Sequence, residues 1–140
     1  EKGFVAVLKT LLEHTKINPG HSRNCLIKHA CHFGQIDVVR FLLKCPEVNP
    51  GVEATRAIGL AYTEGHIDIV RLLLDDCRVD PSIDDNALIK CAAYKGYEKL
   101  FLMLHEHPRV DIKSIAKVMV KITKEQNHMG IAQFVEMLYL

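Results

Sequence analysis

The sequence predicts an all-α solenoid in which pairs of short helices stack on one another, and two markers with the same spacing support this fold class. One is a glycine that precedes a helix-like apolar pattern and recurs at a constant interval, at Gly3, Gly34, Gly65 and Gly96. The other is a short linker segment in the same phase, at residues 17–19, 48–50, 79–81 and 110–112. A period of about 20 to 50 residues is typical of proteins whose units bury their apolar faces only against neighbouring units.

Each period has the pattern of one helix before the glycine and one after it. The segment after the glycine carries apolar residues at helical spacing, with charged residues on the other side at Asp37, Arg40, Asp68 and Arg71. The segments before it, 25–33, 57–64 and 87–95, share a small residue at Ala30, Ala61 and Ala92. We therefore expect an inner helix, a glycine turn, an outer helix with matched core leucines at Leu42, Leu73 and Leu104, and an extended linker.

These markers divide the chain into units. We expect a single domain over 1–140, with a partial repeat at 1–19, full repeats at 20–50, 51–81 and 82–112, and a divergent C-terminal repeat at 113–140. In the last unit the next glycine is Gly130, so its inner segment from Ser114 is expected to be three residues longer and to break the phase. Four lysines at helical spacing there fit a solvated cap face or a docking patch for an acidic partner: Lys113, Lys117, Lys121 and Lys124.

Composition argues against several classes of protein. A net charge of +1 and a pI near 7.9 lack the basic stripe of nucleic-acid-binding proteins. No apolar run reaches the roughly 18 residues of a membrane span, and no signal peptide is evident. Five cysteines without a CxxC motif favour free, buried thiols in a reducing compartment, so we expect an intracellular, cytoplasmic protein. We also expect a monomer. The chain begins without Met and within a repeat, which favours a piece of a longer protein.

The segment from Gly65 to Leu74, with Arg78-Val79-Asp80 after it, resembles the ankyrin repeat. Residues 34–49 and 88–96 fit the same template, so the resemblance covers nearly the whole chain and implies an ankyrin-like helical-repeat solenoid that binds proteins. The chain departs from the family in its period, which is two residues below the usual 33 or so. It also lacks the Thr-Pro-Leu-His start of the inner helix, where Cys25-Leu26-Ile27-Lys28 stands instead.

The resemblance also implies where a partner binds, namely on the concave surface formed by linker tips and inner helices. The expected binding residues are Ser22, Asn24, His32, Phe33, Glu53, Thr55, Thr63, Glu64, Asp84, Asn86, Tyr94 and Lys95. Phe33 and Tyr94 are the expected anchors because aromatic residues are enriched at binding hot spots. The alternative for both is that each covers a neighbouring helix. Arg40 and Arg71 are expected on the convex side.

Residue spacing also raises the hypothesis of a metal site. Cys25, His29 and His32 fall at i, i+4 and i+7, so they could share one helix face and ligate zinc. A fourth ligand is missing, and the repeat register assigns His29 to a packing position matched by Leu60 and Cys91. We therefore expect no metal and no cofactor. The sequence also has no nucleophile elbow, phosphate loop or paired carboxylates, so we expect no enzymatic activity.

One asparagine is a candidate for modification. Asn49 resembles the ankyrin asparagines that an oxygen-dependent asparaginyl hydroxylase modifies, whereas Asn18 resembles them less. The alternative is that Asn49 only makes hydrogen bonds within its linker. The sequence as a whole favours a protein-interaction module with an unidentified protein partner. A second interpretation is a structural spacer that orients a functional domain outside this chain.

Overall fold

The computed structural model describes residues 2–14 and 18–140, without the side chains of residues 2–4, 13 and 22–24. These residues form helices and turns, with no strand among them, as the sequence predicts. The chain divides into two compact units, Glu1–Asp80 and Pro81–Leu140. That both belong to a single domain stays a prediction.

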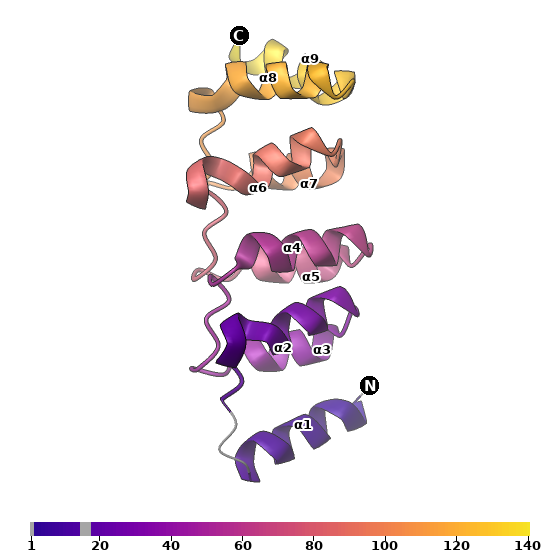
Figure 1. The fold of residues 1–140 in the computed structure, drawn as a ribbon, viewed down its shortest axis with the longest axis vertical. Helices are drawn as coiled ribbons and strands as arrows, with labels where there is room; N and C mark the ends of the chain where they lie inside the picture. The colour runs from indigo at the N-terminus through magenta and orange to yellow at the C-terminus, as the bar shows by residue number, and fades with distance from the viewer. Residues whose placement is uncertain (1, 15–17) are drawn as a thin grey trace. The chain divides into compact units, whose positions relative to one another are not determined.

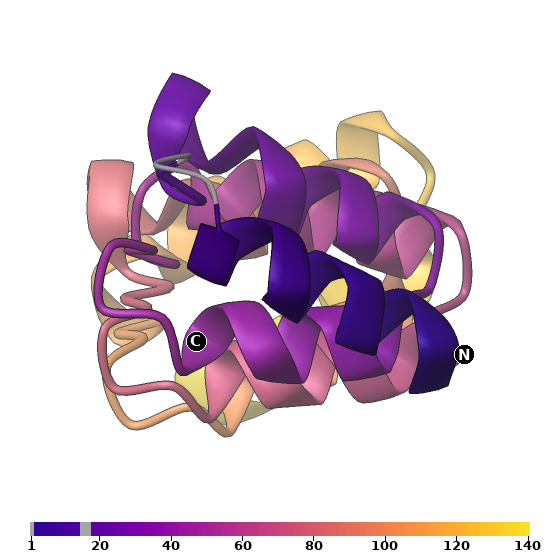
Figure 2. The ribbon, with the colours of Figure 1, turned by 90° about the horizontal axis from the view of Figure 1, so that it is seen from below.

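The first unit contains three layers of helices (Figure 1). They are α1 (Lys2–His14), the pair α2 (His21–His32) and α3 (Ile36–Leu43), and the pair α4 (Ala54–Thr63) and α5 (Ile67–Leu74). The inner helices α2 and α4 pack on each other, and so do the outer helices α3 and α5. Helix α1 packs on α3 (Figure 2), so it takes the place of an outer helix, as its apolar pattern predicted.

The second unit contains two helix pairs. They are α6 (Ile83–Tyr94) with α7 (Glu98–His105), and α8 (Ala116–Glu125) with α9 (Met129–Tyr139), and the 3-10 turn η1 (Lys113–Ile115) precedes α8. Inner helix α6 packs on α8, and outer helix α7 packs on α9. The ring of Phe134 on α9 meets that of Phe101 edge-on, with their centroids 6.0 Å apart. Both pairs therefore repeat the inner and outer arrangement of the first unit.

A residue with positive φ separates the inner from the outer helix in each complete pair. Gly34, Gly65 and Gly96 have φ values of 67°, 81° and 68°, a region that glycine enters without the steric cost of a β-carbon. In the last pair the next position of this evenly spaced series is Asn127, with φ of 62°. The predicted break in phase at Gly130 is therefore wrong, because asparagine tolerates the left-handed region and replaces the glycine. Gly130 lies within α9 instead.

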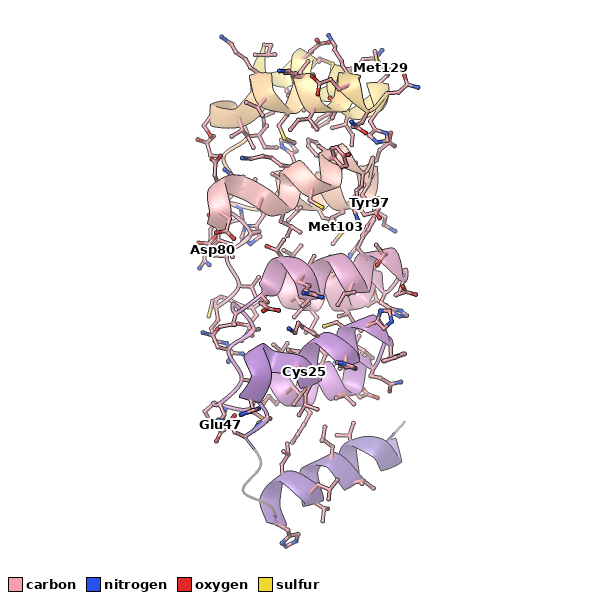
Figure 3. The ribbon with its side chains drawn as sticks, in the orientation of Figure 1. Cys25, Glu47, Asp80, Tyr97, Met103 and Met129 are labelled. Atoms are coloured by element: carbon pink, nitrogen blue, oxygen red, sulfur yellow. The ribbon has the colours of Figure 1, made fainter. Side chains whose placement is uncertain are left out.

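The matched core positions are buried as predicted. Leu42, Leu73 and Leu104 are almost fully buried, and Val135 takes their place in α9. Figure 3 shows the described side chains along the helices. The small inner-helix residues Ala30, Ala61 and Ala92 are buried too. Thr123 continues that series and is fully buried, with its hydroxyl donating to Met119 O at 2.9 Å. This bond satisfies its polar group, so the threonine fits a position that otherwise holds alanine.

The linkers are closed by side chains that accept hydrogen bonds from the backbone. Oδ1 of Asn18 accepts from Gly20 N at 2.7 Å, and Oδ1 of Asn49 accepts from Gly51 N at 3.0 Å. Arg78 joins consecutive linkers, since its guanidinium donates to the carbonyl oxygens of Leu43 and Val48 at 2.7 and 3.0 Å. Asn49 therefore makes a linker hydrogen bond, as the alternative interpretation states, and its hydroxylation stays a prediction.

The cysteines are only partly as expected. Cys31 is fully buried, and burial raises the pKa of its thiol to about 12. Cys77 and Cys91 are exposed, so the expectation that all five pack as buried apolar residues is wrong. Cys77 lies in the turn after α5, and Cys91 lies on a side of α6 that its own unit leaves open.

Candidate partner-binding surface

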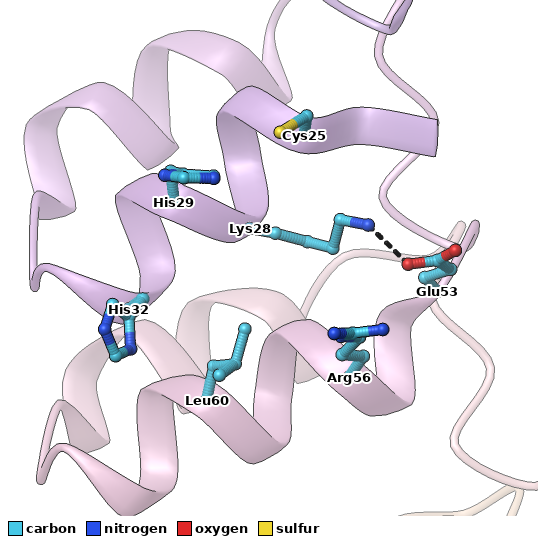
Figure 4. Close-up of a pocket in the computed structure, with 7 residues that line it drawn as sticks. All are labelled: Cys25, Lys28, His29, His32, Glu53, Arg56 and Leu60. Carbon is cyan, nitrogen blue, oxygen red and sulfur yellow. Dashed lines mark hydrogen bonds and ion pairs between the residues drawn. The ribbon is translucent and has the colours of Figure 1, made fainter. Parts of the chain in front are cut away.

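An open hollow of about 360 Å³ lies between the inner helices α2 and α4 of the first unit (Figure 4). Its lining residues are Cys25, Lys28, His29 and His32 from α2, Glu53 from the turn before α4, and Arg56 and Leu60 from α4. Five of these side chains carry polar or charged groups, although more of the lining surface is apolar than polar, and Leu60 contributes a wholly apolar side chain. We call these seven residues the inter-helix hollow.

One ion pair crosses the hollow. The ammonium group of Lys28 reaches from α2 to the carboxylate of Glu53 (Figure 4), and both side chains are mostly shielded from water. Glu53 can point this way because its backbone is left-handed, with φ of 58°, immediately before α4 begins. The charge of Lys28 is therefore neutralised by a residue of the same chain.

Arg56 differs from Lys28 in having no such partner. Its side chain is exposed on α4, and no hydrogen bond or ion pair joins the guanidinium to another described residue. Arginine carries five N–H donors and stays charged at all physiological pH values. Arg56 is therefore the cation of the hollow that is open to a ligand.

Aromatic rings continue the hollow towards the turn at Gly34. The ring of Phe33 lies 4.7 Å from that of His32 in an edge-on arrangement and 6.3 Å from that of His29. Phe33 is nevertheless 63% exposed. Nδ1 of His32 is buried without a hydrogen bond, and its nearest carboxylate oxygen, Oε1 of Glu64, is 3.9 Å away. Phe33 and the two imidazoles thus form one surface beside the polar hollow.

Four other expected binding residues of the first unit lie on α4 or at its ends. Thr63 and Glu64 are exposed at the end of α4, whereas Glu53 and Thr55 are half-buried at its start. The side chains of Ser22 and Asn24 lie outside the described residues. In the second unit, Asp84, Tyr94 and Lys95 are exposed, and Tyr94 is 54% exposed.

Asn86 is the exception among the expected residues. Its side chain is only 8% exposed, so the prediction that it lies open on the surface is wrong. The physical reason is local, because Asp84, Asp85 and Asn86 all have left-handed backbones with φ between 53° and 59°. This turn carries Asn86 inward, while Asp85 stays at the surface and binds Lys90.

His29 also lies elsewhere than the register predicted. We expected a packing position shared with Leu60 and Cys91, but His29 and Cys91 are exposed and Leu60 is half-buried. The sequence reasoning therefore missed Cys25, Lys28, His29, Arg56 and Leu60 as neighbours in one hollow. A signal existed, because Cys25 and Arg56, and likewise His29 and Leu60, are separated by one repeat period and so occupy matched positions on adjacent inner helices.

The hollow has no arrangement suited to a metal ion. Within the side chains that the structure describes, no group of three histidine, cysteine, aspartate or glutamate residues could hold one. This finding includes Cys25, His29 and His32, which spacing alone had brought together. None of the helices in the described ranges is both long and apolar enough to span a bilayer. The expected monomeric state and cytoplasmic location stay predictions.

Comparison with known proteins identifies the repeat. Residues 57–86, which contain most of α4, all of α5 and the linker after it, match the family model of the ankyrin repeat. No curated protein and no solved structure matches the chain. Ankyrin repeats are generally protein–protein interaction modules, and the family is typically without enzymatic activity. The match covers one repeat, and the paired helices and evenly spaced positive-φ turns in the other described residues are consistent with an ankyrin-repeat protein.

Proposed function

We propose that the chain is a protein-interaction module that binds a partner protein through the exposed face of its inner helices. The observation that carries the proposal is the position of Phe33, a large apolar side chain that is 63% exposed beside the inter-helix hollow. A binding site commonly joins a concave depression with a few polar groups and an apolar anchor. Both elements lie on the same side of α2 in the first unit.

The second unit supports the proposal with an exposed aromatic residue at the end of its inner helix α6. Tyr94 matches His32, the neighbour of Phe33, because each of the two lies the same number of positions before its glycine turn. Tyr94 is 54% exposed and carries a hydroxyl beside its apolar ring. Aromatic residues of this kind combine a large contact area with a polar group, which is why they are frequent in interfaces.

The outer helices present a different surface. Asp37, Arg40, Asp68 and Arg71 are exposed there, and their neighbours on the other side of each helix are buried core residues. A mixed-charge surface of this kind is the ordinary solvent face of an amphipathic helix. The outer helices therefore offer matched control positions for a test of binding.

The test is affinity capture from a cell lysate with the full chain, followed by mass spectrometry of the retained proteins. We expect a variant with Phe33→Ala and Tyr94→Ala to lose the partner, while a variant with Arg40→Ala and Arg71→Ala keeps it. Circular dichroism on both variants checks that the helices are intact. Loss of the partner only with the arginine substitutions would move the site to the outer helices. Retention of no partner by the unchanged chain would favour the spacer interpretation instead.

A further inference from the structure

We propose that the inter-helix hollow of the first unit receives an acidic side chain, Asp or Glu, of the partner polypeptide. This inference rests on the proposed function and names the chemistry of the partner at that site. It starts from the charges of the hollow, where two cations, Lys28 and Arg56, face one anion, Glu53. Since Lys28 and Glu53 neutralise each other across the hollow, the guanidinium of Arg56 remains as the uncompensated charge.

The hollow also offers hydrogen-bond donors that an anion would use. Arg56 presents its N–H groups in a planar fork that matches the two oxygens of a carboxylate. The imidazoles of His29 and His32 line the same hollow, and His29 is exposed. In the described part of the chain, neither ring is held by a hydrogen bond from its own nitrogens. A carboxylate between α2 and α4 would thus meet donors from both helices.

A cationic side chain would fit this hollow less well. It would have to approach the free guanidinium of Arg56, and the acceptor that could bind it, Glu53, is already engaged by Lys28. Glu64 is the other carboxylate nearby, but it lies at the edge, 3.9 Å from His32, and does not line the hollow. Like charges placed close together oppose binding, so the hollow selects against basic segments.

The volume and the neighbouring apolar surface favour a peptide segment over a small anion alone. About 360 Å³ is room for more than one side chain, and Leu60 supplies an apolar wall. Phe33 lies next to His32 and is available for an apolar neighbour of the acidic residue. The expected ligand is therefore an acidic residue flanked by an apolar one.

The probe for this inference is an array of short synthetic peptides that are random except at one central position. That position holds Asp, Glu, Gln, Lys or phosphoserine. The unchanged chain is expected to retain the Asp and Glu peptides and to bind them more weakly as salt is raised. Arg56→Gln should weaken this binding about tenfold, because it removes a charged hydrogen-bond partner. Arg71→Gln, on the exposed side of α5 in the same unit, is the matched control and should change nothing.

The outcomes separate this inference from the proposed function. Two outcomes would show that the inner-helix face binds but that the acidic assignment is wrong. In the first, Phe33→Ala abolishes peptide binding and Arg56→Gln leaves it unchanged. In the second, peptides with Gln at the central position bind as well as those with Asp or Glu. Preference for phosphoserine over both Asp and Glu would likewise overturn it in favour of a phosphopeptide. Indifference to both Phe33→Ala and Arg56→Gln would overturn the inference and the proposed function together. Retention of no peptide would also overturn the inference.

Discussion

The imidazole of His66 occupies the space that a β-carbon on Gly34 would need. Such a β-carbon would lie 2.5 Å from Cε1 of His66, and the same ring donates from Nε2 to the carbonyl oxygen of His32 at 3.2 Å. The second unit repeats this relationship between His128 and Gly96, with a bond of 3.0 Å to Tyr94 O. Each glycine therefore serves two purposes, since it makes the left-handed turn and admits the histidine of the next repeat.

This relationship predicts that two glycines of similar conformation differ in their tolerance to alanine. Gly34→Ala should destabilise the first unit by about 2 to 4 kcal/mol, because it adds both left-handed strain and a clash with His66. Gly65→Ala should cost only the strain, about 1 to 2 kcal/mol, since no atom lies within 4 Å of its added β-carbon. Urea unfolding of both variants measures the difference. Equal losses would show that the histidine contact contributes little.

Leu73 tests the core of the first unit. It is 1% exposed on α5, so Leu73→Ala should leave a cavity and lower the free energy of unfolding by about 2 to 5 kcal/mol. Leu26→Ala is the control, because Leu26 is 39% exposed, and its loss should be about 1 kcal/mol or less. Thermal unfolding compares the two. A neutral Leu73→Ala would contradict the register of the outer helices.

Asn127 tests the turn that the sequence reasoning missed. Because its φ is 62°, Asn127→Gly should leave stability nearly unchanged, whereas Asn127→Val should cost about 1 to 2 kcal/mol. Gln126→Val places the same side chain at an exposed neighbour with φ of −92° and serves as the control. Denaturant titration measures all three variants. If valine were equally tolerated at both positions, the turn between α8 and α9 would have to lie elsewhere.

The pair Asp76 and Arg78 predicts a dependence of stability on pH. Hydrogen bonds from the Arg78 guanidinium hold the pKa of the Asp76 carboxyl below its usual value. A carboxyl whose pKa is lower in the folded state adds stability above its unfolded pKa of about 3.9, and this stability is lost as pH falls through the folded pKa. Asp76→Asn should therefore lower stability at neutral pH by up to about 1 kcal/mol and reduce its loss in acid.

Unfolding midpoints measured from neutral pH down to about pH 2 check this expectation. This range includes the pH values below about 3.9, where an unfolded aspartate becomes protonated. Asp75→Asn is the control, because the adjacent Asp75 is exposed at the end of α5. If Asp75→Asn changed the acid response as much as Asp76→Asn, the bond to Arg78 would not be its cause.

The sequence by itself determined the architecture of each repeat. Helical periodicity located the outer helices and their core leucines, since amphipathic helices must bury the same side in every unit. The evenly spaced glycines located three of the turns, because few residues other than glycine adopt positive φ readily. The fourth turn was missed because asparagine also enters this region, so the residue type was a weaker signal than the period itself.

Only the tertiary structure decided which side chains meet between helices. Cys25, His29 and His32 share a spacing that fits zinc, yet their surroundings include Lys28 and Arg56, and the result is a hollow with cationic character. The burial of Asn86 likewise follows from three successive residues with left-handed backbones, which no pattern in the sequence predicted. Spacing fixes the positions of residues along one helix, whereas the environment of a side chain depends on the helix packed against it and on the turn that leads into it.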